Sequence, residues 1–125
     1  MITRIVKMEF DPKKVDAFQI IFKEVKNQIR DFPGCSHLDL LNDQAYPNIF
    51  FTYSIWNNPL DLENYRNSEL FKKTWARTRI LFSEKAEAWS LVKIVEWNTP
   101  SDPIISLAEL KVTHLIINEN LPLTY

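Results

Sequence analysis

A cysteine, a histidine and an aspartate alternate at Cys35, His37 and Asp39. Side chains two residues apart on a β-strand point to the same face, so this spacing predicts that all three share one face. A neutral imidazole can act as a general base near pH 7, which makes His37 a candidate catalytic residue if that face lines a pocket. If the face meets solvent or another subunit instead, the three residues are polar surface residues without a catalytic role.

The sequence offers little for binding a metal or a nucleotide cofactor. No spacing of histidine, cysteine or carboxylate residues resembles a structural zinc site, and His114 lies far along the chain from His37. The only glycine is Gly34, whereas a Rossmann fingerprint or a P-loop needs several glycines. The single cysteine, Cys35, cannot form an internal disulfide, which agrees with a reducing compartment.

The composition is that of one globular domain. The chain has 125 residues, of which 46% are hydrophobic and 25% are charged. Because 15 Lys and Arg residues are matched by 16 Asp and Glu residues, we expect no binding of nucleic acid or of an anionic membrane. Neither a signal peptide nor a segment of transmembrane length is visible, so a cytoplasmic protein is expected.

Hydrophobic periodicity predicts strands and helices in a definite order. The first strand alternates with Val6 and Met8 on one side, and Asp11 and Pro12 then form a helix start. The apolar stripe of that first helix consists of Val15, Phe18, Phe22, Val25 and Ile29. Strands are expected over residues 2–10, 35–41, 49–56 and about 90–97, and helices over residues 12–31, 60–66 and from a cap at Ser68 to about residue 82.

The charged and aromatic residues around the last predicted strand are given structural roles. Glu84, Lys85 and Glu87 are interpreted as the solvated end of the long helix. Trp89 and Trp97 would flank the final strand and fill the edge of the core or a dimer seam.

The order βαββαβ is that of an α+β, ferredoxin-like fold with an antiparallel sheet. Helices would cover one face of the sheet and leave the other bare, as an apolar patch larger than monomers tolerate, so a homodimer is expected. Residues 1–97 would form the domain. Residues 98–125 would form a C-terminal extension, with an apolar stretch of strand character over residues 112–117, and we predict that this extension adds to the dimer interface.

Three segments carry a family resemblance: Gly34 and Cys35 at the head of the second strand, residues 50–56 closing the third, and residues 65–71 opening the long helix. Together they resemble the antibiotic biosynthesis monooxygenase family over about residues 1–97. The resemblance implies a dimeric α+β barrel, in which two protomers join their sheets and each keeps its own pocket between helices and sheet.

The family has branches with different chemistry. One branch degrades haem and ligates the iron through a histidine four residues after the phenylalanine that corresponds to Phe71. Here that position is Trp75, whose indole N–H has no lone pair for iron, so haem degradation is disfavoured. Another branch oxidises polycyclic aromatic phenols or quinols with molecular oxygen, using neither metal nor flavin. The resemblance thus implies a monooxygenase for a small aromatic or quinone-like substrate, without a cofactor.

Such a reaction needs a flat apolar pocket and a group that stabilises an oxyanion. Tyr65 could donate a hydrogen bond, and Arg66 or Arg77 could face an anionic oxygen. The candidate substrate-binding walls are Trp56, Trp75 and Phe71. The alternative is that the aromatic residues are core and the arginines are solvated.

A non-catalytic dimeric domain, either small-ligand-binding or stress-related, is the competing hypothesis. Both hypotheses share the fold. They differ in whether a pocket holds convergent polar groups or is filled by side chains.

Overall fold

The computed structural model describes residues 1–96, and the fold and site lie in one compact unit, Met1–Lys93. Its elements are β1 (Ile2–Glu9), a 3-10 turn η1 (Pro12–Lys14), α1 (Val15–Arg30), β2 (Cys35–Asn42), β3 (Ile49–Trp56), α2 (Pro59–Arg66), α3 (Glu69–Arg79) and β4 (Glu87–Leu91). The predicted extension over residues 98–125, which contains His114, lies outside the described residues. Trp97 lies outside them as well. No helix within residues 1–96 is long and apolar enough to cross a membrane.

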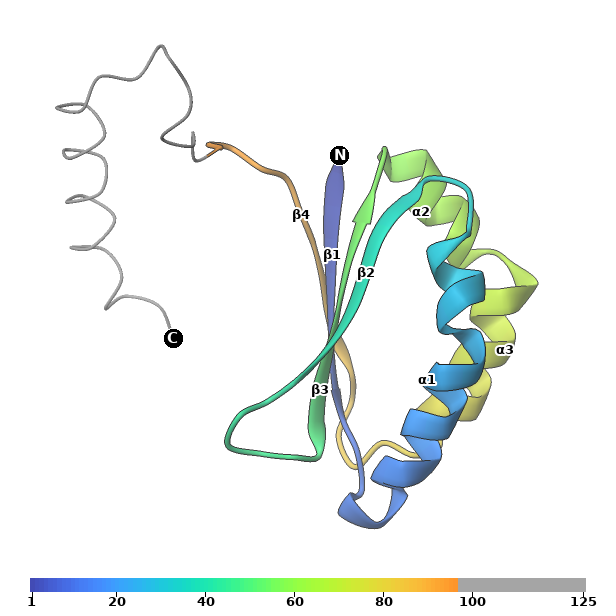
Figure 1. Ribbon diagram of the computed structural model, residues 1–125, viewed down its shortest axis with the longest axis vertical. Helices are drawn as coiled ribbons and strands as arrows, with labels where there is room; N and C mark the ends of the chain where they lie inside the picture. Colours follow the sequence, from blue (N-terminus) through green and yellow to red (C-terminus); the bar gives the residue numbers. More distant parts are fainter. Residues whose placement is uncertain (97–125) are drawn as a thin grey trace, which may run out of the picture. The chain divides into compact units, whose positions relative to one another are not determined.

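The strands form one antiparallel sheet in the order β2-β3-β1-β4. The three helices gather on one face of this sheet (Figure 1). This arrangement confirms the predicted ferredoxin-like α+β fold.

Local signals explain where the first helix starts and which face it buries. The Asp11 carboxylate accepts a hydrogen bond from the Lys13 backbone N–H at 3.0 Å, and Pro12 opens the 3-10 turn that leads into α1. The buried residues of α1 are Phe18, Ile21, Val25 and Ile29. The predicted stripe is therefore correct except that Ile21 belongs to it, while Val15 and Phe22 lie at its partly exposed margin.

The core is centred on Phe10, which follows β1 and is 0% exposed. Its ring stacks on Phe18 with centroids 4.2 Å apart and meets Phe50 and Phe82 at 5.9 and 5.2 Å. Phe10 was predicted to be the last residue of the first strand; it instead forms an isolated bridge with Phe82.

Two predicted boundaries at the end of the domain are wrong. The long helix ends at Arg79 rather than near residue 82, so Glu84 and Lys85 lie beyond it and Glu87 opens β4. The last strand covers Glu87–Leu91 rather than residues 90–97, and Trp89 lies within it. Its start was missed because its helix-facing positions carry small residues, Ala88 and Ser90, and therefore give no apolar alternation.

Candidate active site

A cavity of about 360 Å³ lies between the helices and the inner face of the sheet. Its sheet side is formed by alternate residues of the strands, such as Val6, Ser54 and Ala88, and its helical side by residues of α1, α2 and α3. The small side chains of β4 leave this space open. The volume falls within the range of small-molecule sites.

Stacked and edge-on aromatic rings make a continuous wall along the cavity. Tyr65 stacks on Trp56 at 4.9 Å and meets Phe71 edge-on at 5.3 Å. Phe71 in turn stacks on Trp75 with centroids 5.9 Å apart. The three predicted wall residues, Trp56, Phe71 and Trp75, therefore line one cavity together with Tyr65. Such a wall suits a flat apolar ligand.

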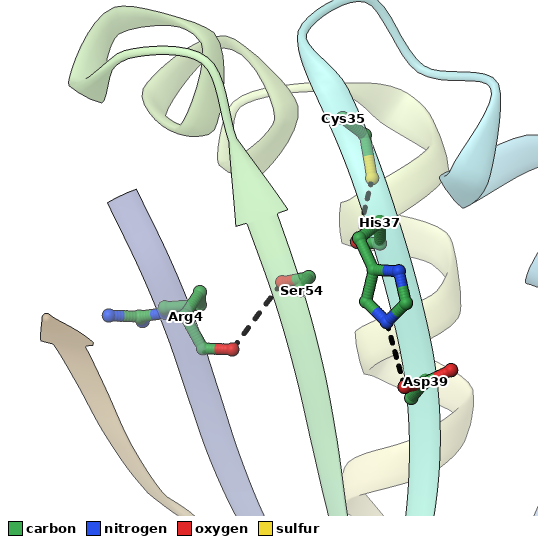
Figure 2. Close-up of polar contacts among 5 residues, drawn as sticks. All are labelled: Arg4, Cys35, His37, Asp39 and Ser54. Carbon is green, nitrogen blue, oxygen red and sulfur yellow. Dashed lines mark hydrogen bonds and ion pairs between the residues drawn. The ribbon is translucent and has the colours of Figure 1, made fainter. Parts of the chain in front are cut away.

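The innermost ring has no polar group to offer a ligand. Trp56 is 1% exposed, and its indole N–H donates to the Ser54 hydroxyl at 3.0 Å. That hydroxyl also donates to the backbone oxygen of Arg4 at 3.5 Å, a contact drawn in Figure 2. Trp56 thus acts as a fixed wall.

Tyr65 is the phenol of the cavity. Burial raises the pKa of Tyr65 well above its usual value, and the negative charge that the nearby Cys35 carries as a thiolate raises this pKa further. The hydroxyl therefore stays protonated at neutral pH. Within residues 1–96 it has no hydrogen-bond partner, so it can donate to a ligand oxygen but is unsuited to act as a base.

Two arginines converge on the cavity. Arg66 is exposed and pairs with Glu63 at 3.6 Å. Arg4 lies on the inner face of β1 and donates to the Ser90 hydroxyl at 2.8 Å. Burial lowers the pKa of Arg4, the Arg66 charge lowers this pKa further, and Glu63 partly offsets both effects. Both guanidinium groups remain charged at neutral pH.

Sequence reasoning missed Arg4, although a signal was present. Arg4 occupies the same alternating face of the first strand as Val6 and Met8, where a charged side chain is unexpected. The other predicted arginine, Arg77, is not at the cavity; it pairs with Glu24 at 3.1 Å and so joins α3 to α1.

The predicted Cys35, His37 and Asp39 cluster is divided by a β-bulge. Cys35 pairs with Trp56, but His37 already pairs with the next residue, Ile55, so Ser36 is the extra residue. Cross-strand partners point to the same face, and Cys35 therefore points to the helical side whereas His37 and Asp39 point to the outer side. The prediction of one shared face is wrong for this reason.

The structure does not bring His37 to the cavity. The His37 Nε2 atom lies 2.7 Å from Asp39 Oδ2 (Figure 2). The imidazole also meets Tyr53 edge-on, on the outer face of the sheet. The Cys35 thiol donates to the His37 backbone oxygen at 3.5 Å, and burial raises the pKa of Cys35. That cysteine is therefore a poor candidate for a thiolate nucleophile.

Trp75, at the position that would carry a haem ligand, packs against other aromatic rings. Trp75 stacks on Phe71 and meets Phe82 edge-on at 5.4 Å. Within residues 1–96, no three His, Cys, Asp or Glu side chains lie close enough together to hold a metal ion.

Comparison with known proteins agrees with this fold. The chain is 19% identical to an antibiotic biosynthesis monooxygenase of known crystal structure, with a TM-score of 0.72, over 76% of this chain and 100% of that one. A conserved protein from Methanosarcina mazei is 20% identical, with a TM-score of 0.71, over 74% of this chain and 93% of that one. A Pseudomonas aeruginosa protein is also 20% identical, with a TM-score of 0.67, over 75% and 94% of the two chains. These likenesses establish the fold class. No curated protein matches the chain.

The family model for antibiotic biosynthesis monooxygenases matches residues 1–77, which include β1 through most of α3. The chain belongs to this family. The match confirms the resemblance drawn from the sequence.

Proposed function

We propose that the protein is a monooxygenase that oxidises a small aromatic or quinone-like substrate with molecular oxygen, without metal or flavin. The observation that carries this proposal is the cavity itself: its wall is aromatic, and Tyr65, Arg4 and Arg66 bring polar groups to it. A domain filled by its own side chains would offer no such space.

In this mechanism a phenol or quinol binds as its anion. The Tyr65 hydroxyl donates a hydrogen bond to the negative oxygen, and the positive charge of Arg66 stabilises it without a direct contact being required. The electron-rich ring then reacts with oxygen, so that a ring C–H position becomes a carbonyl. One oxygen atom enters the product and the other leaves as water. All electrons come from the substrate, so no external reductant is needed.

The anion forms before it reaches the cavity. No carboxylate or imidazole is among the described residues that line the cavity, and Tyr65 is held protonated. The rate should therefore rise with pH along the substrate's own titration and not along that of a histidine.

Oxygen uptake with a panel of hydroxylated anthracene-type and quinol substrates tests the proposal. We expect uptake by the protein and substrate alone, and a loss of about 10²-fold in kcat/KM in Tyr65→Phe, because a donor to the oxyanion is removed. Arg79→Gln, which alters an exposed arginine away from the cavity, is the matched control. His37→Ala should also retain activity, and a large loss there would instead favour the catalytic role predicted from the sequence.

Ligand binding without oxygen uptake from any substrate would refute the oxygenase. It would favour the alternative of a non-catalytic ligand-binding domain.

We also propose that the protein is a homodimer formed through the outer face of the sheet. Trp89 and Leu91 are 42% and 46% exposed there, and Ile5 and Tyr53 extend the same apolar surface, since Ile5 pairs with both Tyr53 and Trp89. We expect Trp89→Glu to shift the protein towards monomer in analytical ultracentrifugation, because a charge would be desolvated in the interface. Ile20→Glu, at an exposed position of α1, is the control. Equal sedimentation of the two variants would contradict an interface at β4.

A further inference from the structure

We propose that the cavity selects a flat fused-ring aromatic acid, whose carboxylate binds Arg4 and Arg66 while its rings stack with the parallel rings of Phe71 and Trp75. The inference deepens the proposed function by naming a substrate class, and it rests on that function only in using the same cavity. It requires a permanently anionic substituent besides any oxygen that reacts.

The charges at the cavity are unbalanced. Arg66 pairs with Glu63, and among residues 1–96 no carboxylate lies within ion-pair distance of Arg4. The two guanidinium groups of Arg4 and Arg66 are thus accompanied by one carboxylate, Glu63, which leaves one positive charge in excess. The chain as a whole has a formal net charge of −1, so this excess is local and does not reflect a generally basic surface.

Arg4 lines the cavity and is held by a neighbouring strand. In the sheet it stands between Ser54 of β3 and Ser90 of β4, and its side chain points away from Ser54 (Figure 2). The guanidinium donates one N–H to the Ser90 hydroxyl at 2.8 Å. Its other N–H groups remain available, because a guanidinium carries five donors.

Burial and mutual repulsion disfavour the positive charge of Arg4 at the cavity. Burial and the nearby Arg66 charge both lower the pKa of Arg4, so the charged form lacks some of the stabilisation it would have in water. A carboxylate would offset both effects and would match the planar fork of an arginine in a bidentate pair. The hydroxyl of Ser90 accepts from Arg4 and keeps its own hydrogen for an oxygen of the ligand.

The shape and the apolar lining define the remainder of the ligand. The Phe71 and Trp75 rings are stacked with an interplanar angle of 8°, and a flat ring system can extend such a stack. A simple aliphatic acid would leave the aromatic wall uncovered. A neutral polycycle would leave Arg4 without a partner.

Equilibrium binding under anaerobic conditions tests the inference, with anthracene-2-carboxylate and anthracene-2-carboxamide as fluorescent probes. We expect the carboxylate to bind at least about tenfold more tightly than the amide. Its affinity should fall with added salt while that of the amide stays constant. Arg4→Gln should remove most of this preference by weakening only the carboxylate.

Two further variants make the result specific. Arg4→Lys keeps the charge but loses the fork, so it should recover part of the preference. Arg66→Gln should reduce the preference independently, which keeps the test valid if Arg4→Gln folds poorly by circular dichroism. Arg79→Gln should bind both probes as the wild type does.

Equal affinity for the two probes, no binding of either, or a preference unchanged in both Arg4→Gln and Arg66→Gln would overturn the inference. Its failure is distinguishable from failure of the oxygenase. A carboxylate preference without any oxygen uptake refutes only the reaction, whereas uptake with neutral and acidic substrates of equal affinity refutes only the acid-binding role.

Discussion

Phe10→Ala is expected to lower the free energy of unfolding by about 3–5 kcal/mol. The side chain is 0% exposed and contacts the rings of Phe18, Phe50 and Phe82. Those rings belong to α1, to β3 and to the segment after α3. Because three separate segments would have to move to close the gap, the cavity should remain largely unfilled and the loss should approach the upper part of this range. Urea denaturation measures it.

Tyr46→Ala is the matched control for this truncation. Tyr46 is 62% exposed in the loop between β2 and β3, so its removal should cost less than about 0.5 kcal/mol. If the two variants unfold at the same denaturant concentration with the same slope, Phe10 is not the centre of the core.

The elements of the fold were predictable where one segment carries its own signal. The alternation of Val6 and Met8, the cap at Asp11 and the stripe through Phe18 and Val25 are local patterns, and the structure contains the corresponding strand and helix. The final strand has no such pattern. Its position is set by pairing with β1, from Thr3↔Leu91 to Lys7↔Glu87, which is a tertiary property.

The site was predictable to the same extent. Tyr65 and Phe71 lie in α2 and α3, whose starts are capped by Asn58 and Ser68. Their rings meet Trp56 and Trp75 along one cavity, as the sequence predicted. The bulge at Ser36 could not be foreseen, because it appears only in the register between β2 and β3. One extra residue reverses the face on which Cys35 lies relative to His37. The catalytic roles assigned to Tyr65 and Arg66 stay predictions.

Gly34→Ala is expected to cost about 2–4 kcal/mol of stability and to weaken ligand binding as well. Gly34 has a φ of +90°, a conformation that strains any residue with a Cβ. An added Cβ would also overlap the side chain of Asp61, in the first turn of α2. The Gly34 backbone oxygen accepts from the Asn57 N–H at 2.8 Å, so the turn before β2 is fixed against the start of α2.

Relief of the overlap requires α2 to move, and α2 carries Tyr65 and Arg66. The Asn58 side chain, which caps α2 by accepting from the Asp61 N–H at 2.9 Å, would shift with it. The expected result is therefore a combined loss: a lower unfolding midpoint in urea, and weaker binding of anthracene-2-carboxylate at a temperature where the variant remains folded. A substitution that only reduced stability would leave the affinity of the folded fraction unchanged.

A double-mutant cycle separates the two causes. Asp61→Gly removes the atoms that the new Cβ would overlap, at a cost of about 1 kcal/mol for a helical glycine, which the single variant measures. If the overlap contributes, the double variant Gly34→Ala/Asp61→Gly should be more stable than the sum of the single losses by about 1 kcal/mol or more, and ligand affinity should recover with it. Strict additivity would assign the whole loss to the backbone conformation. Wild-type stability of Gly34→Ala would show that the turn before β2 does not hold α2 in place.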